Sequence, residues 1–542
     1  MKKAVRHTFA AIGLMALITS CSDFGDVNID PEHMNETNVP HEMLFTNAQH
    51  QGLGSDWDVW RMGCIYAGQW VQHLSSVENW WTYALYRWND GYSGSYWDIY
   101  SGDRGAVRDI TNVMYLWRDD ASHVADYNMA RIMRVYIMHR MTDLYGDIPY
   151  SQAGQPSLYS YPVYDRQQDI YADMLNELNE AQAGLQGGET APLGTHDVYF
   201  QGNMEQWRKF ANSLMLRLAM RMSKVDPESA RSWVQTAVSN GLLESISDNV
   251  RLEHPEGVTT DDSSEPYAKI FAHEARGEFF LSNVFVDMLK STNDPRLALI
   301  GTVCADPTIS HQAGSSFQYG NSDPAIQNGL PIGYNNDPTS NWFIGRDYQE
   351  FNDTELLNNY QSRYSTVNRY TYSNPRSQTY LVTYAQQQLL LAEAAWRGWV
   401  DGSPQSFYEE GIRAAMEQFA QYPNASALYS QYLTSEAISN YLQQNPFNQN
   451  DALRQINTQY WITCFCDEYE AFSNWRRSGY PELVSAQKPS NPYPESATDG
   501  SIPRRFQYPT AESQVNMEYY NEAVRRMTGG DTFMSRVWWD VQ

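Results

Sequence analysis

The sequence predicts a mainly α-helical protein in which pairs of helices form a scaffold beside one long irregular segment. Apolar residues recur at spacings of three and four over several long stretches, which is the period of a helix face. Tight turns join some of these stretches, as in helical-repeat folds. Between roughly residues 244 and 376 this period is lost, and Asn, Asp, Gly, Pro and Ser dominate. An irregular segment of this length inside a compact domain is usually functional.

The chain begins with the pattern of a lipoprotein signal over residues 1–20. Basic residues precede an apolar stretch, residues 9–18, and small residues then lead to Cys21. A cysteine at this position is typical of bacterial lipoproteins, whose cysteine thiol takes a diacylglycerol and becomes the new N-terminus. The apolar stretch is shorter than the ~20 residues of a membrane-spanning helix. We therefore expect a mature domain, residues 21–542, that Cys21 anchors to the membrane. The alternative is an ordinary secretion signal with an incidental cysteine.

Two helices are predicted before the clearest pair. The first runs from Val124 to Tyr145, with a stripe of mostly apolar side chains along one face. The second follows Asp165, a good N-cap residue, and continues to Leu185, after which Gly187 and Gly188 end it.

The clearest unit is an antiparallel helix pair with almost no loop. Apolar residues from Trp207 onward line one face of a helix that continues to about Lys224. Asp226 then caps a second helix, which has Pro227 at its first position and ends at Gly241.

A later helix is predicted over residues 379–399 and is apolar nearly all round at residues 389–392, which indicates a central position. A turn at residues 401–404 leads to another helix over about 405–422. No clean 34-residue period is present, so any repeats are degenerate.

The amino-acid composition limits the classes of molecule that the protein could bind. A formal charge of −26 argues against nucleic acid and anionic surfaces, because both require a positive field. The chain contains 38 Tyr, 17 Trp and 19 Phe, yet its mean hydropathy is −0.58, so polar uncharged residues accompany the rings. Such surfaces suit neutral, hydroxyl-rich ligands, although most of the rings are expected to fill the core.

Cysteine and catalytic motifs give little sign of chemistry. Besides Cys21, the cysteines at 64, 304, 464 and 466 show no metal-ligand spacing and are expected to be buried free thiols. No phosphate loop, zinc-protease motif or nucleophile elbow is present, and no metal or cofactor is expected. Because 64 residues are acidic, an acid/base pair of a glycoside hydrolase stays an alternative.

Two polar segments rich in aromatic residues are the candidate ligand sites, and core packing is the alternative for both. The first carries four rings within seven residues: Trp80, Trp81, Tyr83 and Tyr86, preceded by Asn79. The second is an Asn-rich loop that presents Asp337, Asn341, Trp342 and Phe343. The rings would stack on sugar faces, and the amides and the carboxylate would bond sugar hydroxyls.

Two other motifs are expected to be structural. In residues 144–150, Gly and Pro end a helix and Asp147 would bond loop amides. In residues 474–481, Arg476 and Arg477 at a helix end would bond loop carbonyls, the alternative being an anion clamp.

Short motifs are spread over nearly the whole chain. They are Cys21 with residues 27–31, then residues 145–150, 207–214, 293–297, 389–395, 475–481 and 502–509. In this order they resemble the SusD/RagB family of Bacteroidetes outer-membrane lipoproteins, especially its second SusD-like branch. These are scaffold motifs, and ligand residues vary within the family, so the candidate ligand residues depend on the aromatic argument alone.

The resemblance implies a non-catalytic binding protein, lipid-anchored on the outer face of the outer membrane. Family members cap a TonB-dependent transporter of the SusC type and deliver oligosaccharides, or in some lineages peptides, into its barrel. Their fold is mainly α, with degenerate tetratricopeptide-like helix pairs supporting an irregular ligand-binding subdomain. We therefore expect capture of an oligosaccharide for import. Peptide capture by the same architecture and an all-α glycoside hydrolase are the alternatives.

Overall fold

The computed structural model describes residues 40–541, except for 79–84, 101, 103–104, 186–189, 256, 259–262, 312–315, 334–359, 488 and 491. The signal peptide and Cys21 therefore lie outside the described residues. Within them the protein is mainly helical with a few short strands, which confirms the predicted fold class.

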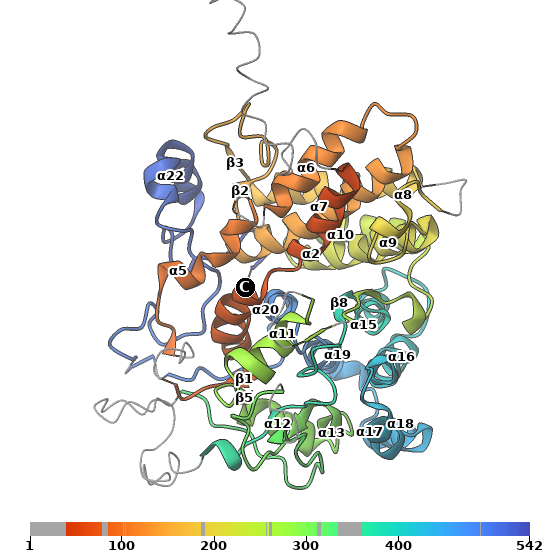
Figure 1. Cartoon of the computed structure of the whole chain (residues 1–542), viewed down its shortest axis with the longest axis vertical. Helices are drawn as coiled ribbons and strands as arrows, with labels where there is room; N and C mark the ends of the chain where they lie inside the picture. The colour runs from red at the N-terminus through yellow and green to blue at the C-terminus, as the bar shows by residue number, and fades with distance from the viewer. Residues whose placement is uncertain are drawn as a thin grey trace, which may run out of the picture.

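Helices that follow one another in sequence pack against one another in the first half of the chain. The series is α2 (His41–Gln51), α6 (Ala106–Trp117), α7 (Val124–Tyr145), α8 (Gln167–Ala183), α9 (Met204–Arg221) and α10 (Pro227–Asn240). Each contacts the next, and Figure 1 shows α6 to α10 together in the upper part of the molecule. This is the arrangement expected of a scaffold of helix pairs.

The C-terminal half adds a second set of helices and returns to the first. It contains α15 (Tyr384–Trp396), α16 (Pro404–Glu417), α17 (Ser426–Tyr432), α18 (Ser435–Gln444), α19 (Ala452–Thr463), α20 (Glu468–Ser478), α21 (Glu512–Val515) and α22 (Met517–Arg526). Helix α15 contacts α9, α16 and α19, and α20 contacts α7. The two halves are therefore joined through α15 and α20 (Figure 1).

Local signals place several helices as predicted. Helix α7 has the predicted bounds and ends at Gly146, whose φ of 87° suits a residue without Cβ. The Asp226 carboxylate accepts the Ser229 N–H at the start of α10, and Gly241 ends that helix.

Two boundaries differ from the prediction. Asp165 does not cap α8: its carboxylate accepts the backbone N–H groups of Tyr150, at 3.1 Å, and Ser151, at 2.8 Å, and Arg166 is the N-cap residue. Helix α8 also ends at Ala183, before the predicted Gly187 and Gly188. Asp165 is the last residue of β3, and its side chain bonds the backbone that follows β2, so it is not available to the helix.

The predicted helix over residues 379–399 is a strand followed by a helix. Thr379–Val382 forms strand β8, and Thr383 begins α15 through a capping box with Gln386. Strand β8 pairs antiparallel with β4 (Val250–Leu252), a partner distant in sequence that local periodicity does not reveal.

The stretch over residues 244–376 is less irregular than its composition suggests. It holds α11 (Pro266–Lys269), α12 (Asn283–Ser291), α13 (Leu297–Ile300), the π-helix η8 (Ile270–Glu274), the 3-10 helices η7 (Ile246–Asp248) and η10 (Tyr360–Ser362), and strands β5 (Phe280–Leu281), β6 (Gly301–Thr302) and β7 (Thr366–Val367). Strand β5 pairs with β1 (Leu74–Ser75), and β6 pairs with β7. Together with β4–β8, the β1–β5 pair fastens this stretch to the helical scaffold.

The remaining elements of the described residues are short. They are β2 (Ile148–Pro149), paired with β3 (Tyr164–Asp165), and α3 (Asp56–Asp58), η3 (Val59–Ala67), α4 (Gly68–Trp70), α5 (Asp90–Ser93), η5 (Ser95–Ile99), η6 (Gly194–His196), η11 (Gln418–Gln421) and η12 (Gln449–Asp451). Among the described residues, no helix combines the length and the apolar character needed to cross a membrane.

Aromatic residues fill much of the core, as expected. The buried Trp70 ring lies 5.2 Å from the Tyr66 ring, 5.3 Å from Phe472 and 4.7 Å from Phe506, measured between centroids. These rings come from opposite ends of the sequence, so their packing holds the N-terminal and C-terminal segments together.

Candidate functional site

Most of the predicted ligand residues lie outside the described part of the chain. These are Asn79, Trp80, Trp81 and Tyr83 in the first segment, and Asp337, Asn341, Trp342 and Phe343 in the second.

Tyr86 is the one predicted ligand residue that the structure describes, and it is buried. Only 1 % of Tyr86 is exposed. Its hydroxyl accepts the Ala486 N–H at 3.1 Å and lies 3.4 Å from the Ser485 hydroxyl, and burial raises its pKa to about 12. The ring has no free face for stacking on a sugar, so Tyr86 anchors the segment instead.

A partly exposed aromatic cluster lies instead where α3 leads into the π-helix η3. The Trp57 ring, 45 % exposed, lies 5.3 Å from Trp60, and Trp60 lies 6.0 Å from Tyr92. The Arg61 guanidinium lies 5.0 Å from the Trp57 ring and 5.4 Å from the Tyr92 ring. We refer to Trp57, Trp60, Arg61 and Tyr92 as the Trp57 cluster.

Local sequence positions this cluster. Ser55 starts α3 through a capping box with Asp58, and the following helical turns bring Trp57, Trp60 and Arg61 to neighbouring positions. Tyr92 comes from α5, which Asn89 caps by accepting the Tyr92 N–H.

A cavity of about 350 Å³ adjoins the cluster, and Trp57 is one of its walls. Two of its lining residues, Pro266 and Lys269, belong to α11, which packs against α3 and η3. Its other lining residues are His50, Gln51, Leu53, Gly54, Ser55, Asp56, Leu252, His254, Ser264, Pro266 and Lys269. The volume is at the small end of the range for small-molecule sites.

The walls of this cavity are polar but close to neutral in charge. Burial lowers the pKa of His50, and it lowers the pKa of His254 to about 4, so both rings are uncharged at neutral pH. The Lys269 ammonium pairs with the Asp56 carboxylate at 2.8 Å. The buried Oε1 of Gln51 has no hydrogen-bond partner among the described residues. The cavity therefore suits a neutral ligand that offers hydroxyl or amide groups.

A hydrogen-bonded chain supports the wall behind His254. The Thr379 hydroxyl lies 3.0 Å from His254 Nε2 and 3.2 Å from the Glu265 carboxyl, and Glu265 also accepts the Ala268 N–H. Burial raises the pKa of Glu265 to about 8. Glu265 caps α11 and is not a cavity residue. Asp56 is the only carboxylate among the described lining residues, so these residues do not place two carboxylates across the cavity as a glycosidase requires.

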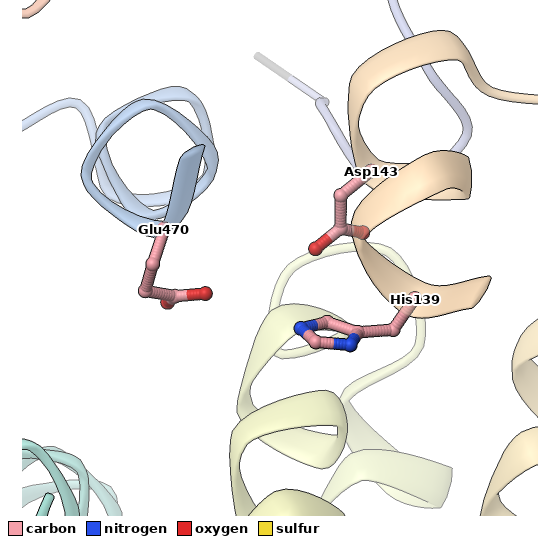
Figure 2. Close-up of side chains that lie close together, drawn as sticks. All are labelled: His139, Asp143 and Glu470. Atoms are coloured by element: carbon pink, nitrogen blue, oxygen red, sulfur yellow. The ribbon is translucent and has the colours of Figure 1, made fainter. Parts of the chain in front are cut away.

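Three buried side chains could be mistaken for a metal site. His139 and Asp143 of α7 face Glu470 of α20, with ligand atoms within 4.8 Å of one another (Figure 2). The Glu470 carboxylate accepts Arg221 Nη2 at 2.5 Å and the Tyr460 hydroxyl at 2.9 Å.

The other two members of this group are equally engaged. Asp143 accepts Trp539 Nε1 at 3.0 Å, and Arg221 Nε lies 3.3 Å from its carboxylate. Burial and then the charge of Arg217 lower the pKa of His139 well below its usual value. Arginines already supply the positive charge here, so the group joins α7, α9 and α20 as an ion-pair network.

The two motifs predicted to be structural make most of the expected contacts. Asp147 accepts the Gln167 N–H at 2.8 Å, and Arg476 donates to the carbonyl oxygens of Asp143, at 2.6 Å, and Arg504, at 2.9 Å. Arg477 differs from the prediction, because it bonds the Glu393 carboxylate at 2.8 Å and no loop carbonyl among the described residues. The thiols of Cys64, Cys304 and Cys464 are buried and free, and that of Cys466 is half-buried and free.

The sequence contained a signal for the Trp57 cluster that the motif analysis missed. Trp57 and Trp60 are three residues apart and follow Ser55, a good N-cap residue, and Arg61 comes directly after Trp60. On a helix such a spacing places the rings on one face, whereas Tyr92 joins them only through the fold.

Comparisons with known proteins agree with this architecture. The sequence profile of a SusD-like family, described as starch-binding and associating with the outer membrane, matches residues 32–509. A solved structure named as a chitin-binding protein is 29% identical, with a TM-score of 0.75 over 93% of this chain and 100% of that one. A Bacteroidetes SusD-like structure is 28% identical, with a TM-score of 0.77 over the same shares. No curated protein matches at a significant level.

A more distant structure shows the fold alone. A SusD homologue from Bacteroides thetaiotaomicron is 22% identical, with a TM-score of 0.71 over 93% of this chain and 100% of that one.

Proposed function

Because the chain belongs to the SusD-like family of starch-binding, outer-membrane-associated proteins, we propose that it captures oligosaccharides at the cell surface and hands them to a SusC-type TonB-dependent transporter. The observation that carries the binding part is the exposed Trp57 ring beside a polar, nearly neutral cavity. Flat rings stack on sugar faces, and buried polar groups such as Gln51 penalise ligands that leave them unpaired.

Arg61 has a defined part in this proposal. Its guanidinium is held over the rings of Trp57 and Tyr92. It is therefore pre-organised and loses little conformational freedom when it donates hydrogen bonds to the hydroxyls of a bound sugar. The candidate residues around Trp81 and Trp342 would extend the platform to a longer glycan. The resemblance to a chitin-binding protein makes chitooligosaccharides the first ligands to test.

We further propose that the protein does not turn its ligand over. Asp56, the carboxylate on the described cavity wall, is neutralised by Lys269 and has no second carboxylate opposite it there. A glycoside hydrolase would instead need an acid and a base or nucleophile facing each other.

The test is calorimetric titration of the domain lacking its signal and anchor with chito- and maltooligosaccharides. We expect Trp57→Ala to lose about 1–3 kcal/mol of affinity, on the scale of ring stacking on nucleic-acid bases, while its melting temperature barely changes. Trp81→Ala and Trp342→Ala should show smaller losses of the same kind if they extend the platform.

Tyr115→Ala is the matched control. Like Trp57, Tyr115 is exposed (69 %) and has an arginine over its ring, with the Arg118 guanidinium carbon 5.5 Å from the ring centroid. Unlike Trp57, it lies on α6 and does not line the Trp57 cavity. Unchanged affinity in Trp57→Ala for a glycan that the wild type binds would remove the Trp57 cluster from the site. Binding of extended peptides and of no glycan would favour the peptide alternative, and release of reducing ends in excess of protein would favour the hydrolase.

A further inference from the structure

A second cavity, of about 430 Å³, brings four arginines together in an acidic protein. Its lining includes four arginines, Arg166, Arg505, Arg526 and Arg536, and Asp147 is the only carboxylate among the described lining residues. The whole chain has 38 basic and 64 acidic residues, so this grouping runs against the overall charge. The cavity lies between the start of α8, the turn after α7 and the C-terminal segment, and none of its lining residues belongs to the Trp57 cavity.

The arginines are not all neutralised by their neighbours. Three of the four have a carboxylate partner: Arg526 Nε pairs with Asp147 at 2.6 Å, Arg536 Nη1 with Asp540 at 2.7 Å and Arg505 Nη1 with Asp531 at 2.6 Å. Arg166 is exposed and makes no ion pair within the part of the chain that the structure describes.

Arg505 adds a buried donor with no acceptor. Its residue exposure is 0 %, and its Nη1 donates to Asp531 at 2.6 Å, but its Nη2 has no hydrogen-bond partner in the described structure. A buried charged donor that makes no hydrogen bond lowers the stability of the fold, unless a bound ligand supplies the acceptor. Arg505 Nε also donates to the Tyr145 carbonyl at 3.2 Å, so Nη2 is the one nitrogen of this guanidinium that a ligand acceptor would complete.

The N-terminus of α8 also lies at this cavity. The helix has 17 residues, and its first two, Gln167 and Gln168, line the cavity. Its N-cap residue is Arg166, whose side chain makes no capping bond, and the Asp147 carboxylate accepts the Gln167 N–H at 2.8 Å, so this helix end already holds one acidic partner. Gln167 Oε1, in a residue that is 0 % exposed, is also without a partner among the described atoms and can accept a hydroxyl.

A bare oxyanion would leave most of this cavity unfilled. The half-buried ring of Trp538 lines it as well, and stacking on an aromatic ring suits a sugar face. We propose that this cavity binds an acidic sugar unit, either a uronate or a sulfated sugar, through its oxyanion. Arg166, Arg505 and Arg526 would hold the charge, Gln167 would accept a hydroxyl and Trp538 would cover one face. The site is separate from the Trp57 cavity.

The test is calorimetric titration of the domain without signal and anchor with glucuronate, glucose 6-sulfate, inorganic sulfate and glucose at constant ionic strength. We expect saturable binding at one site for at least one of the charged sugars, weaker binding of sulfate and none of glucose. Binding of only the uronate or only the sulfated sugar supports the proposal and identifies the oxyanion. No saturable binding of either charged sugar overturns it.

Variants locate the binding. Arg526→Gln and Arg166→Gln should each lower the affinity for the charged sugar by about tenfold, because each removes one charge-assisted hydrogen bond. Arg525→Gln, the same change of charge on the next residue of α22 and away from the cavity, should leave affinity within about twofold. Equal losses in Arg525→Gln and Arg526→Gln would show a general charge effect and overturn the site.

Arg166 is exposed, so its variant tests the site even if Arg526→Gln lowers stability. Trp57→Ala should not change binding of the acidic sugar. Failure at this second cavity is therefore distinguishable from failure of the proposed oligosaccharide site.

Discussion

Arg477 and Glu393 form a two-pronged ion pair in the core, with Nη1–Oε1 and Nη2–Oε2 both at 2.8 Å. They are 84 residues apart in sequence and join α20 to α15. Burial alone would raise the pKa of Glu393, but the positive charges of Arg477 and Arg397 lower it to about 2. The pair connects two of the motifs that the sequence analysis recognised as scaffold.

Glu393→Gln should destabilise the protein by about 3–5 kcal/mol, because it leaves Arg477 buried without its counter-charge. The pKa of Glu393 is lower in the folded than in the unfolded chain, so its ionised form stabilises the fold above pH 4.5. That contribution is lost as the pH falls from about 4.5 to about 2. Urea unfolding at several pH values should therefore show the wild type and the variant converging in acid.

Glu410→Gln is the control for this pair. Glu410 is 43% exposed and lies 4.0 Å from Arg413, so its loss should cost less than about 1 kcal/mol. A cost for Glu393→Gln no larger than that of Glu410→Gln would mean that the buried pair does not stabilise the fold.

Glu265 should give the free energy of unfolding the opposite dependence on pH. Burial raises its pKa to about 8 from 4.5, so the folded state holds a proton that the unfolded state has lost between these values. Stability should therefore fall as the pH rises through this window, by at most about 1.4 kcal/mol per pH unit. Glu265→Gln keeps the bonds to Ala268 and Thr379 without the ionisation. We expect this variant to be the more stable protein at pH 8 and about equal to wild type at pH 4.5.

The effect of Glu265 on stability is best measured above pH 6.5, because His254 also titrates below that pH. Its pKa falls from 6.5 to about 4 on folding, so its contribution rises with pH only up to 6.5. Glu253→Gln, at a carboxylate that is 65% exposed, is the control and should leave the pH profile of the wild type unchanged. Parallel pH profiles for wild type and Glu265→Gln would contradict a protonated Glu265.

The scaffold could be predicted because its signals are local. Asp226 and Gly241 bound α10 through contacts within a few residues, and sequence spacing alone revealed them. The strand Thr379–Val382 could not be predicted in this way, because its conformation depends on pairing with Val250–Leu252. Apolar periodicity does not distinguish such a short buried strand from the first turn of a helix.

The candidate site was harder to predict for the same reason. Tyr86 lies in a segment that looks like a binding loop, yet its side chain is buried and its hydroxyl contacts residues 485–486. Trp57 and Tyr92 belong to separate elements, and Arg505 and Arg166 are brought to one cavity from distant parts of the chain. Sites built from several elements depend on tertiary structure, whereas sequence motifs here report mainly the scaffold.

The proposed transporter hand-off predicts a stable partner in the membrane. Gentle detergent extraction of cells, followed by pull-down of the native protein, should recover a TonB-dependent barrel as the dominant partner. A known outer-membrane complex recovered from the same extract would show that extraction preserves assemblies. Recovery of the protein alone, beside an intact control complex, would contradict the hand-off.

The proposed lipid anchor depends on one thiol, that of Cys21. Cys21→Ser removes the sulfur that takes the diacylglycerol, so we expect the variant to escape processing at this position and to lose the lipid-dependent membrane attachment of the wild type. Cys466→Ser, at a half-buried free thiol of the folded domain, should leave processing and fractionation unchanged. Mass spectrometry of the N-terminus together with membrane fractionation measures both effects. A Cys21→Ser protein that is still cut before residue 21 and stays with the membranes as the wild type does would show that another feature provides the anchor.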